Sequence, residues 1–352
     1  MHVAALLALG VRATPRTPPP QSKATTTLPP PSAARIAALV AVPIAWGTYS
    51  PAVEFAYALP HTPPPQALSF AFVAVSAASL QLASALAPPE QPLEPTDENS
   101  DAPPDDALRL RAGAELGLWL FLGSNIQLLG LQLTDAARAG FIVQLTTVLV
   151  PLAEALLLRR ALPPRLWAAV AAATAGIAQI SVLGGAASGD PRGDALVAAS
   201  AVMYTAHVVR LGEFAAALPA LGLAKAKAAA QLALNVVTLG ALQAGGGVDL
   251  GGWAASLTPA EAATLGGVCL WNGLVPSAFT TWAQSYGQSA VSPTAANVLY
   301  SVQPVTNAAI AALVLGEVLT PDEVGGGALV LLGAALASTA SEREGAAAEE
   351  SG

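Results

Sequence analysis

Charged side chains are scarce in this sequence. Only 11% of its 352 residues are Asp, Glu, Lys or Arg, against about 25% in an ordinary soluble domain. Stretches such as 112–134 and 139–158 contain no more than one ionised residue, and each matches the roughly 20 residues with which a helix crosses a bilayer. Because such stretches recur along the chain, the lack of charge predicts an all-α membrane protein.

The sequence also has almost no cysteine and lacks the common catalytic motifs. Cys269 is the single cysteine, so no intrachain disulfide can form, and within an apolar run it is an ordinary small filler. The sequence has no Cys/His cluster with metal-ligand spacing, no nucleotide-binding P-loop, no HExxH motif and no basic patch suited to nucleic acid. These absences predict no cofactor, no metal, no nucleic-acid partner and no enzymatic activity.

The first 34 residues form a zone of their own. They contain Arg12, Arg16 and Lys23 among many Ser, Thr and Pro residues, and the first acidic residue of the chain is Glu54. This composition is typical of an organellar transit peptide. The short apolar run 3–11 also permits a secretory signal, and an uncleaved disordered tail is a third interpretation. The membrane that holds the protein, with a plastid envelope as one candidate, depends on this choice.

Ten apolar stretches follow from residue 35 onward, and most linkers between them are short and contain Pro or Gly. One linker, 88–106, is long, acidic and rich in Pro, which predicts a disordered loop, and the end of the chain, 341–352, predicts a disordered tail. The expected membrane-spanning helices are 35–58, 66–87, 111–131, 137–158, 164–183, 193–214, 223–244, 260–283, 294–315 and 322–340.

The basic residues support this division. If ten helices alternate in direction, both termini lie on one side of the membrane, and of the 15 Lys and Arg residues only Arg138 and Arg192 fall on the opposite side. Cytoplasmic loops of membrane proteins carry such an excess of basic residues. The pattern therefore predicts that both termini face the cytosol, or the stroma if the membrane is a plastid envelope.

The chain also contains an internal repeat. A shift of 157 residues, as from Gln127 to Gln284, also aligns Gly130 with Gly287 and segment 162–164 with 319–321. The repeat pairs five helices in 35–183 with five in 193–340. Since five is an odd number, the two halves must enter the membrane in opposite senses, which is an inverted-repeat arrangement common among secondary transporters.

Three motifs resemble those of one family. The tetrapeptide Ala45-Trp46-Gly47-Thr48 with Pro51, the stretch 134–151, and the segment 315–320 (LGEVLT) resemble the EamA-type family of the drug/metabolite transporter superfamily. This resemblance implies ten helices in two inverted five-helix repeats. It also implies that the first four helices of each repeat surround a central cavity, while the fifth and tenth pack to the side. The sequence departs from the pattern at Arg159-Arg160, where the first repeat lacks the Gly-Glu of the second.

Polar and aromatic residues within the apolar stretches are the candidates for a solute path, because polar groups in hydrocarbon face the bundle interior or one another. Gln127 and Gln284 occupy equivalent positions, and they would bind a solute at mid-depth or join helices by hydrogen bonds. Aromatic residues near the start of the chain would line a pore or simply pack. The full set is Trp46, Tyr49, Glu54, Asn125, Gln127, Gln144, Tyr204, His207, Trp271, Asn272, Gln284, Tyr300, Gln303 and Asn307.

Two of these candidates can carry a proton. Glu54 follows Pro51 in the first apolar stretch and would couple transport to protons or neutralise a cationic solute; the alternative is a solvated carboxylate near the outer interface. His207 would relay protons near neutral pH or serve as a packing residue. Among the other carboxylates, Glu154 lies about one turn from Arg159, which predicts an ion pair at the interface.

Cations are not expected in the middle of any helix, since Lys225 and Lys227 fall at the start of 223–244. That argues against the branches of the superfamily that carry phosphorylated solutes. The sequence thus favours a secondary transporter or exporter of a small neutral or zwitterionic metabolite, with the solute and the lipid bilayer as partners and a homodimer as one open arrangement. The alternative is a non-transporting helical scaffold or receptor.

Overall fold

The computed structural model describes residues 32–87, 105–134, 136–156, 162–183, 190–310, 321, 324–333 and 335–336. Within these ranges every regular element is a helix. The first half consists of α2 (Ala33–Gly47), α3 (Tyr49–Tyr57), α4 (Pro65–Leu86), α5 (Asp105–Leu131), α6 (Ala136–Val143), α7 (Thr146–Leu156) and α8 (Pro164–Leu183). The second half consists of α9 (Pro191–Ala215), α10 (Ala220–Ala244), α11 (Leu250–Ser256), α12 (Pro259–Asn272), the π-helix η1 (Gly273–Phe279), α13 (Thr280–Gly287), α14 (Pro293–Tyr300), α15 (Gln303–Ile310) and the short helix Val324–Gly333.

The helices begin where the sequence supplies starting signals. Proline stands in the first turn of α4, α9, α12 and α14, where its missing N–H costs no helical hydrogen bond. Three of these helices also have side-chain caps: Asp190 accepts from the Arg192 N–H, Ser292 accepts from the Ala295 N–H, and Thr258 forms a capping box with Glu261. The long apolar runs between such starts then form continuous helices.

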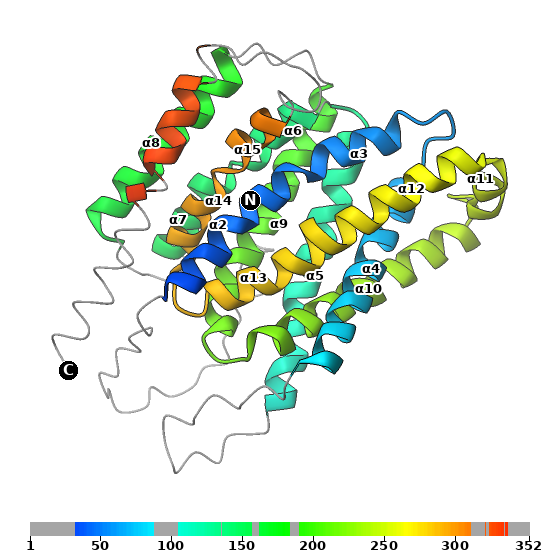
Figure 1. Cartoon of the computed structure of the whole chain (residues 1–352), viewed down its shortest axis with the longest axis horizontal. Coiled ribbons are helices and arrows are strands. Elements are labelled where there is room, and N and C mark those ends of the chain that lie inside the picture. The colour runs from blue at the N-terminus through cyan, green and yellow to red at the C-terminus, as the bar shows by residue number, and fades with distance from the viewer. Residues whose placement is uncertain are drawn as a thin grey trace.

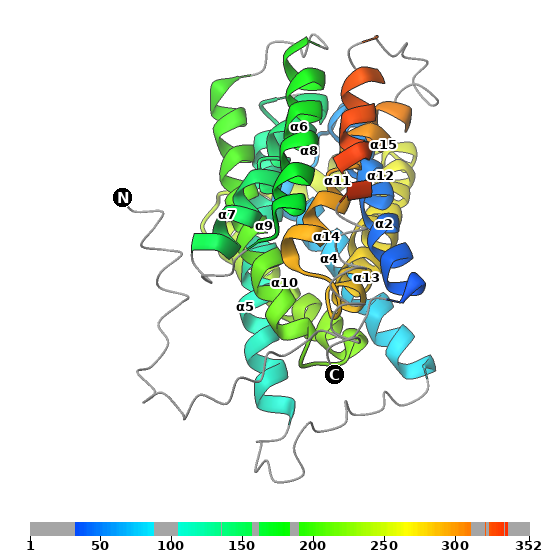
Figure 2. The same cartoon turned by 90° about the vertical axis from the view of Figure 1, so that its left-hand side faces the viewer.

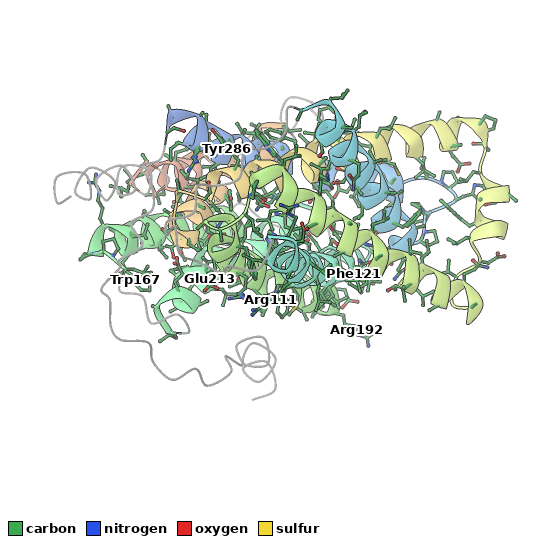
Figure 3. The ribbon with its side chains drawn as sticks, turned by 90° about the horizontal axis from the view of Figure 1, so that it is seen from below. Arg111, Phe121, Trp167, Arg192, Glu213 and Tyr286 are labelled. Carbon is green, nitrogen blue, oxygen red and sulfur yellow. The ribbon has the colours of Figure 1, made fainter. Side chains whose placement is uncertain are left out.

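The helices pack side by side into one bundle, as Figure 2 shows. Five of them are long and apolar enough to cross a membrane, namely Ala33–Tyr57, Pro65–Leu86, Asp106–Leu131, Pro191–Ala215 and Pro259–Gly287. Figure 3 shows Trp167 and Arg192 at the periphery, where both side chains are exposed. Length and composition together define an integral membrane protein.

Two of the expected helices are split by a two-residue turn, in addition to the first, which Thr48 divides into α2 and α3. The fourth is split between α6 and α7 by a turn at residues 144–145, and the ninth is split between α14 and α15 by a turn at 301–302. The two turns are 157 residues apart, the same shift that aligns Gln127 with Gln284. A total of ten complete spans stays a prediction, but the matched turns are new structural features of the repeat.

The helix Val324–Gly333 packs against α8 at one side of the bundle (Figure 1). Their closest approach is at glycines: a Cβ on Gly176 would lie 2.4 Å from the Gly326 carbonyl oxygen, and one on Gly333 would lie 2.8 Å from that of Ala169. Small residues allow helices in membranes to pack this closely. The lateral position of these two helices agrees with what the family resemblance implied.

We therefore expect Gly176→Ala to lower the free energy of unfolding by about 1–3 kcal/mol, because the added methyl would collide with backbone that cannot move independently. The matched control is Gly240→Ala on α10, where a Cβ meets nothing within 4 Å. Alanine favours helix over glycine by about 1 kcal/mol, so the control should be neutral or stabilising. Unfolding in detergent micelles measures both changes, and equal effects of the two variants would refute the close-packing argument.

Candidate functional site

A cavity of about 140 Å³ lies inside the bundle, between the two halves of the chain. A cavity of this size accommodates a molecule about as large as benzene. Its walls come from α2, α3, α5 and α6 of the first half and from α9, α10, η1, α13 and α15 of the second. The lining residues are Trp46, Tyr49, Leu120, Ser124, Gln127, Val143, Tyr204, His207, Val208, Gln231, Pro276, Ser277, Thr280, Thr281, Gln284 and Gln303.

One wall is aromatic and is held by the π-helix. The indole Nε1 of Trp46 donates to the carbonyl oxygen of Pro276 at 3.2 Å, and its ring packs edge-to-face on Tyr300 with 5.2 Å between centroids. A proline within a helix removes one donor and displaces the hydrogen-bond ladder, which is a usual cause of such a local change in winding. The sequence thereby fixes Trp46 against the second half.

The second wall of the cavity contains a hydrogen bond between α5 and α9. The hydroxyl of Tyr204 donates to Oε1 of Gln127 at 2.7 Å. Gln284, the repeat partner of Gln127, also lines the cavity and is buried. The two equivalent amides thus border the same space from opposite halves, where they can offer donors and acceptors to a bound molecule.

The interrupted helices supply a third wall. Nε2 of Gln144, at the turn between α6 and α7, donates to Oε1 of Gln303 at 3.4 Å. Gln303 is the first residue of α15, directly after the turn in the other half, and its side chain borders the cavity. Helix interruptions near the middle of membrane transporters leave backbone and side-chain polar groups free for a solute.

His207 on α9 also borders the cavity, and it is almost completely buried. Its Nε2 has no hydrogen-bond partner among the residues that the structure describes. Lys227 on α10 lies close enough to His207 for the two groups to interact electrostatically. Lys227 is 0% exposed and donates through Nζ to the carbonyl oxygen of Thr281 at 3.2 Å. Lys227 lies near the start of α10, as expected, but its burial inside the bundle was not predicted from the sequence.

Seven predicted residues line the cavity, namely Trp46, Tyr49, Gln127, Tyr204, His207, Gln284 and Gln303. Gln144 and Tyr300 contact lining residues directly. Asn125 does not line it: its Nδ2 donates to the Phe121 carbonyl oxygen at 2.9 Å and to Asn235 at 3.4 Å. The side chain of Asn307 lies outside the part of the chain that the structure describes.

Two predicted residues have exposed side chains that do not line the cavity. Glu54 has an exposed side chain, because the buried face of α3 runs through Ser50, Val53 and Ala56 and leaves position 54 on another side. Trp271 is 47% exposed and donates through Nε1 to Thr48 Oγ1 at 2.9 Å. The prediction that these side chains face the solute path is wrong for this structure.

Asn272 is buried but is not among the residues that line the cavity. Neither its Oδ1 nor its Nδ2 has a partner in the described part of the chain. It immediately precedes η1 in the chain, so its backbone lies where the helix changes its winding.

The expected ion pair between Glu154 and Arg159 falls on a residue outside the described ranges. The structure instead places Glu154 in the interior, where its Oε2 accepts from the backbone N–H of Thr294 at 2.7 Å. The carboxylate of the first half thus contacts the first turn of α14 in the second half.

Sequence reasoning missed the hydroxyl residues Ser124, Thr280 and Thr281 and the amide of Gln231. Serine and threonine are frequent in membrane helices and often bond to their own backbone, as Thr280 does to Pro276. Their presence in a helix therefore carries little signal. Gln231 lies one turn beyond Lys227 on α10, so a buried face through both residues was the available clue.

A bundle with long apolar helices and a cavity between its halves defines a membrane protein suited to a small solute. The family of EamA-like transporters matches residues 34–182 and 214–339, so the chain belongs to the EamA-like transporter family, part of the drug/metabolite transporter superfamily. This is a family of membrane transporters for small solutes. Its two matched segments establish two repeats.

One solved crystal structure aligns with 88% of this chain and 98% of its own, with a TM-score of 0.64 and 19% sequence identity. At that identity the likeness shows the fold alone. Among curated proteins, none matches the sequence.

Proposed function

We propose that the protein is a secondary transporter or exporter that carries a small organic metabolite by alternating access. The observation that carries this proposal is the cavity itself, which both repeats line with equivalent amides, Gln127 and Gln284. A site shared by two repeats at mid-depth is the usual place for solute binding in such transporters. Alternating access would then follow from rocking of one repeat against the other.

The proposed halves are inverted, with both termini in the cytosol or the stroma. The odd number of expected helices per half and the distribution of basic residues support this orientation. The matched turns at 144–145 and 301–302 also support two related halves. A plastid envelope is the membrane we propose, on the composition of residues 1–34.

Contacts between the halves lie at both ends of the bundle. At one end, Nδ1 of His61, in the turn after α3, lies 3.0 Å from Oε1 of Glu261 on α12, and Trp253 Nε1 donates to the His61 carbonyl oxygen at 3.1 Å. At the other, Arg210 of α9 pairs with Glu115 of α5. Because α10 runs the length of the bundle from the end of α9 to α11, these contacts are far apart (Figure 1). Rocking would open one set while the other holds.

His207 is the residue that we assign to proton coupling, because it borders the cavity and its Nε2 has no partner among the described residues. Proteoliposomes incubated with a metabolite mixture and analysed by mass spectrometry first identify the solute. We then expect an imposed pH gradient to accelerate its uptake by the wild type about tenfold, a typical scale for coupled sites. His207→Gln should abolish this acceleration and retain downhill exchange.

Glu54→Gln is the matched control, because it removes an exposed carboxylate that lies outside the cavity. It should keep the full response to the pH gradient. A His207→Gln protein that still responded like the wild type would overturn the coupling role. Proteoliposomes that take up nothing above protein-free vesicles would overturn transport itself.

A further inference from the structure

Lys227 is a buried lysine that has no acidic partner among the residues that the structure describes. Its side chain is 0% exposed, and its one hydrogen bond goes from Nζ to the Thr281 carbonyl oxygen at 3.2 Å. That oxygen is shared, since Ser285 Oγ also donates to it at 2.8 Å. Among the residues that the structure describes, no carboxylate lies within ion-pair distance of Lys227.

A buried lysine with a single hydrogen bond is unfavourable unless another group supplies further acceptors or a negative charge. An ammonium group has three donors, and one shared carbonyl oxygen satisfies a single one of them. Burying an ammonium away from water and without a counter-ion carries a large free-energy penalty. Ionisable residues inside membrane helices are therefore typically found where an ion or solute is handled.

Lys227 stands directly behind the cavity wall. Its acceptor residue Thr281, its electrostatic neighbour His207, and Gln231 one turn further along α10 all border the cavity. On the remaining side α10 packs closely on α5, where a Cβ on Gly117 would lie 2.8 Å from the Lys227 carbonyl oxygen. The backbone of Lys227 is thus packed against α5, and its side chain lies next to residues that border the cavity.

His207 borders one corner of the cavity with an Nε2 that has no partner among the described residues, and the Lys227 amine, with a single hydrogen bond, lies behind that corner. We propose that this corner binds a carboxylate group of the solute, with Lys227 and His207 as the residues that recognise it. The inference rests on the proposed transport function and narrows its solute class. A carboxylate supplies the missing negative charge and accepts several charge-assisted hydrogen bonds.

The rest of the solute would then face the aromatic side chains that line the cavity, Trp46, Tyr49 and Tyr204. A cavity of about 140 Å³ has room for a group about as large as a benzene ring. One lysine balances one negative charge, so a monocarboxylate or a zwitterion fits better than a phosphate dianion. The solute class is a small monocarboxylate with an apolar or aromatic group.

Benzoate and benzamide are suitable probes because they share a ring and a size and differ in charge. We expect the purified full-length protein in detergent to bind benzoate at least about tenfold more tightly than benzamide in isothermal titration, the scale of a charge-assisted contact. Lys227→Gln should bring the two affinities within about twofold, and Lys227→Arg should preserve the preference. The matched control is Lys225→Gln, which removes a cation two residues away that donates to Ser84 Oγ at 2.8 Å. It should leave the preference unchanged.

Equal affinity of the wild type for the two probes, binding of neither, or a preference that persists in Lys227→Gln would overturn the inference. If Lys227→Gln does not fold, the Lys227→Arg protein decides, because loss of the preference there contradicts recognition by a cation. Flux through proteoliposomes is measured separately. Solute flux without a carboxylate preference would refute this inference alone, whereas a carboxylate preference without any flux would refute transport.

Discussion

Replacing Arg210 with methionine is expected to lower the free energy of unfolding by about 3 kcal/mol. Arg210 on α9 faces Glu115 on α5, with Nη2 donating to Oε2 at 3.0 Å and Nε donating to Oε1. It also pairs with Glu213, and its guanidinium lies 4.9 Å from the centre of the Phe214 ring. Methionine keeps much of the apolar contact but leaves two carboxylates facing each other with reduced access to water.

The partial exposure of this cluster sets the magnitude. The side chains of Arg210 and Glu115 are each 19% exposed, so water relieves part of the penalty and the loss falls at the low end of the range for buried pairs. α5 and α9 form the most extensive helix contact in the described chain, so the cluster stabilises a central interface between the halves. The effect should therefore appear as global destabilisation.

Reversible unfolding in mixed detergent micelles measures this loss. Arg109→Met is the matched control, since Arg109 pairs with Asp106 at 3.5 Å and the Asp106 side chain is 85% exposed. Such a surface pair contributes at most about 1 kcal/mol. Adding Glu115→Gln to Arg210→Met should recover a large part of the lost stability. Arg210→Met that destabilised no more than Arg109→Met would show that the cluster is not an interior ion pair.

The sequence predicted much of the cavity because polar residues inside apolar helices are few and costly. Gln127 and Gln284 also share the 157-residue shift, and both border the cavity. Their neighbours could not be predicted in the same way. The hydrogen bond from Tyr204 to Gln127 depends on how α5 packs against α9, and helical periodicity does not determine the rotation of one helix against another.

The burial of Lys227 also could not be predicted from the sequence. Near the start of an apolar stretch, a lysine either extends to the interface or faces the bundle, and the sequence pattern is similar in both cases. Packing decides between them, and here the side chain is buried and donates to α13. Glu54 is the opposite case, since it lies deep in the expected helix but on an exposed side of α3.

The interruptions of the two split helices were also not predicted. The turn at 144–145 lies in a run without Pro or Gly, and Pro304 follows the turn at 301–302 by two residues. Neither turn therefore has the usual local breaker at its centre. The two turns nevertheless agree with the 157-residue shift of the internal repeat. The repeat alone could not reveal them, because a turn that both halves share is visible only in the folded structure.

Glu154→Ala is expected to lower the free energy of unfolding by about 2–4 kcal/mol. Glu154 is 1% exposed, and its Oε2 accepts from the Thr294 N–H at 2.7 Å in the first turn of α14. A carboxylate at a helix N-terminus satisfies an otherwise unpaired donor and interacts favourably with the helix dipole. Alanine would leave that N–H unsatisfied in the interior, at about 1–3 kcal/mol, and would add a cavity.

Glu154→Gln separates the hydrogen bond from the charge, because glutamine keeps an acceptor oxygen of the same reach. It should retain at least about 1 kcal/mol of the stability that alanine loses, the net contribution of a typical hydrogen bond. Ser292→Ala is the control at the same helix end, since Ser292 accepts from the Ala295 N–H and its removal should cost about 1 kcal/mol. Unfolding in detergent provides all three values. Equal losses of stability for Glu154→Gln and Glu154→Ala would contradict the hydrogen-bond account. The stabilisation would then come from the negative charge of Glu154 at the start of α14.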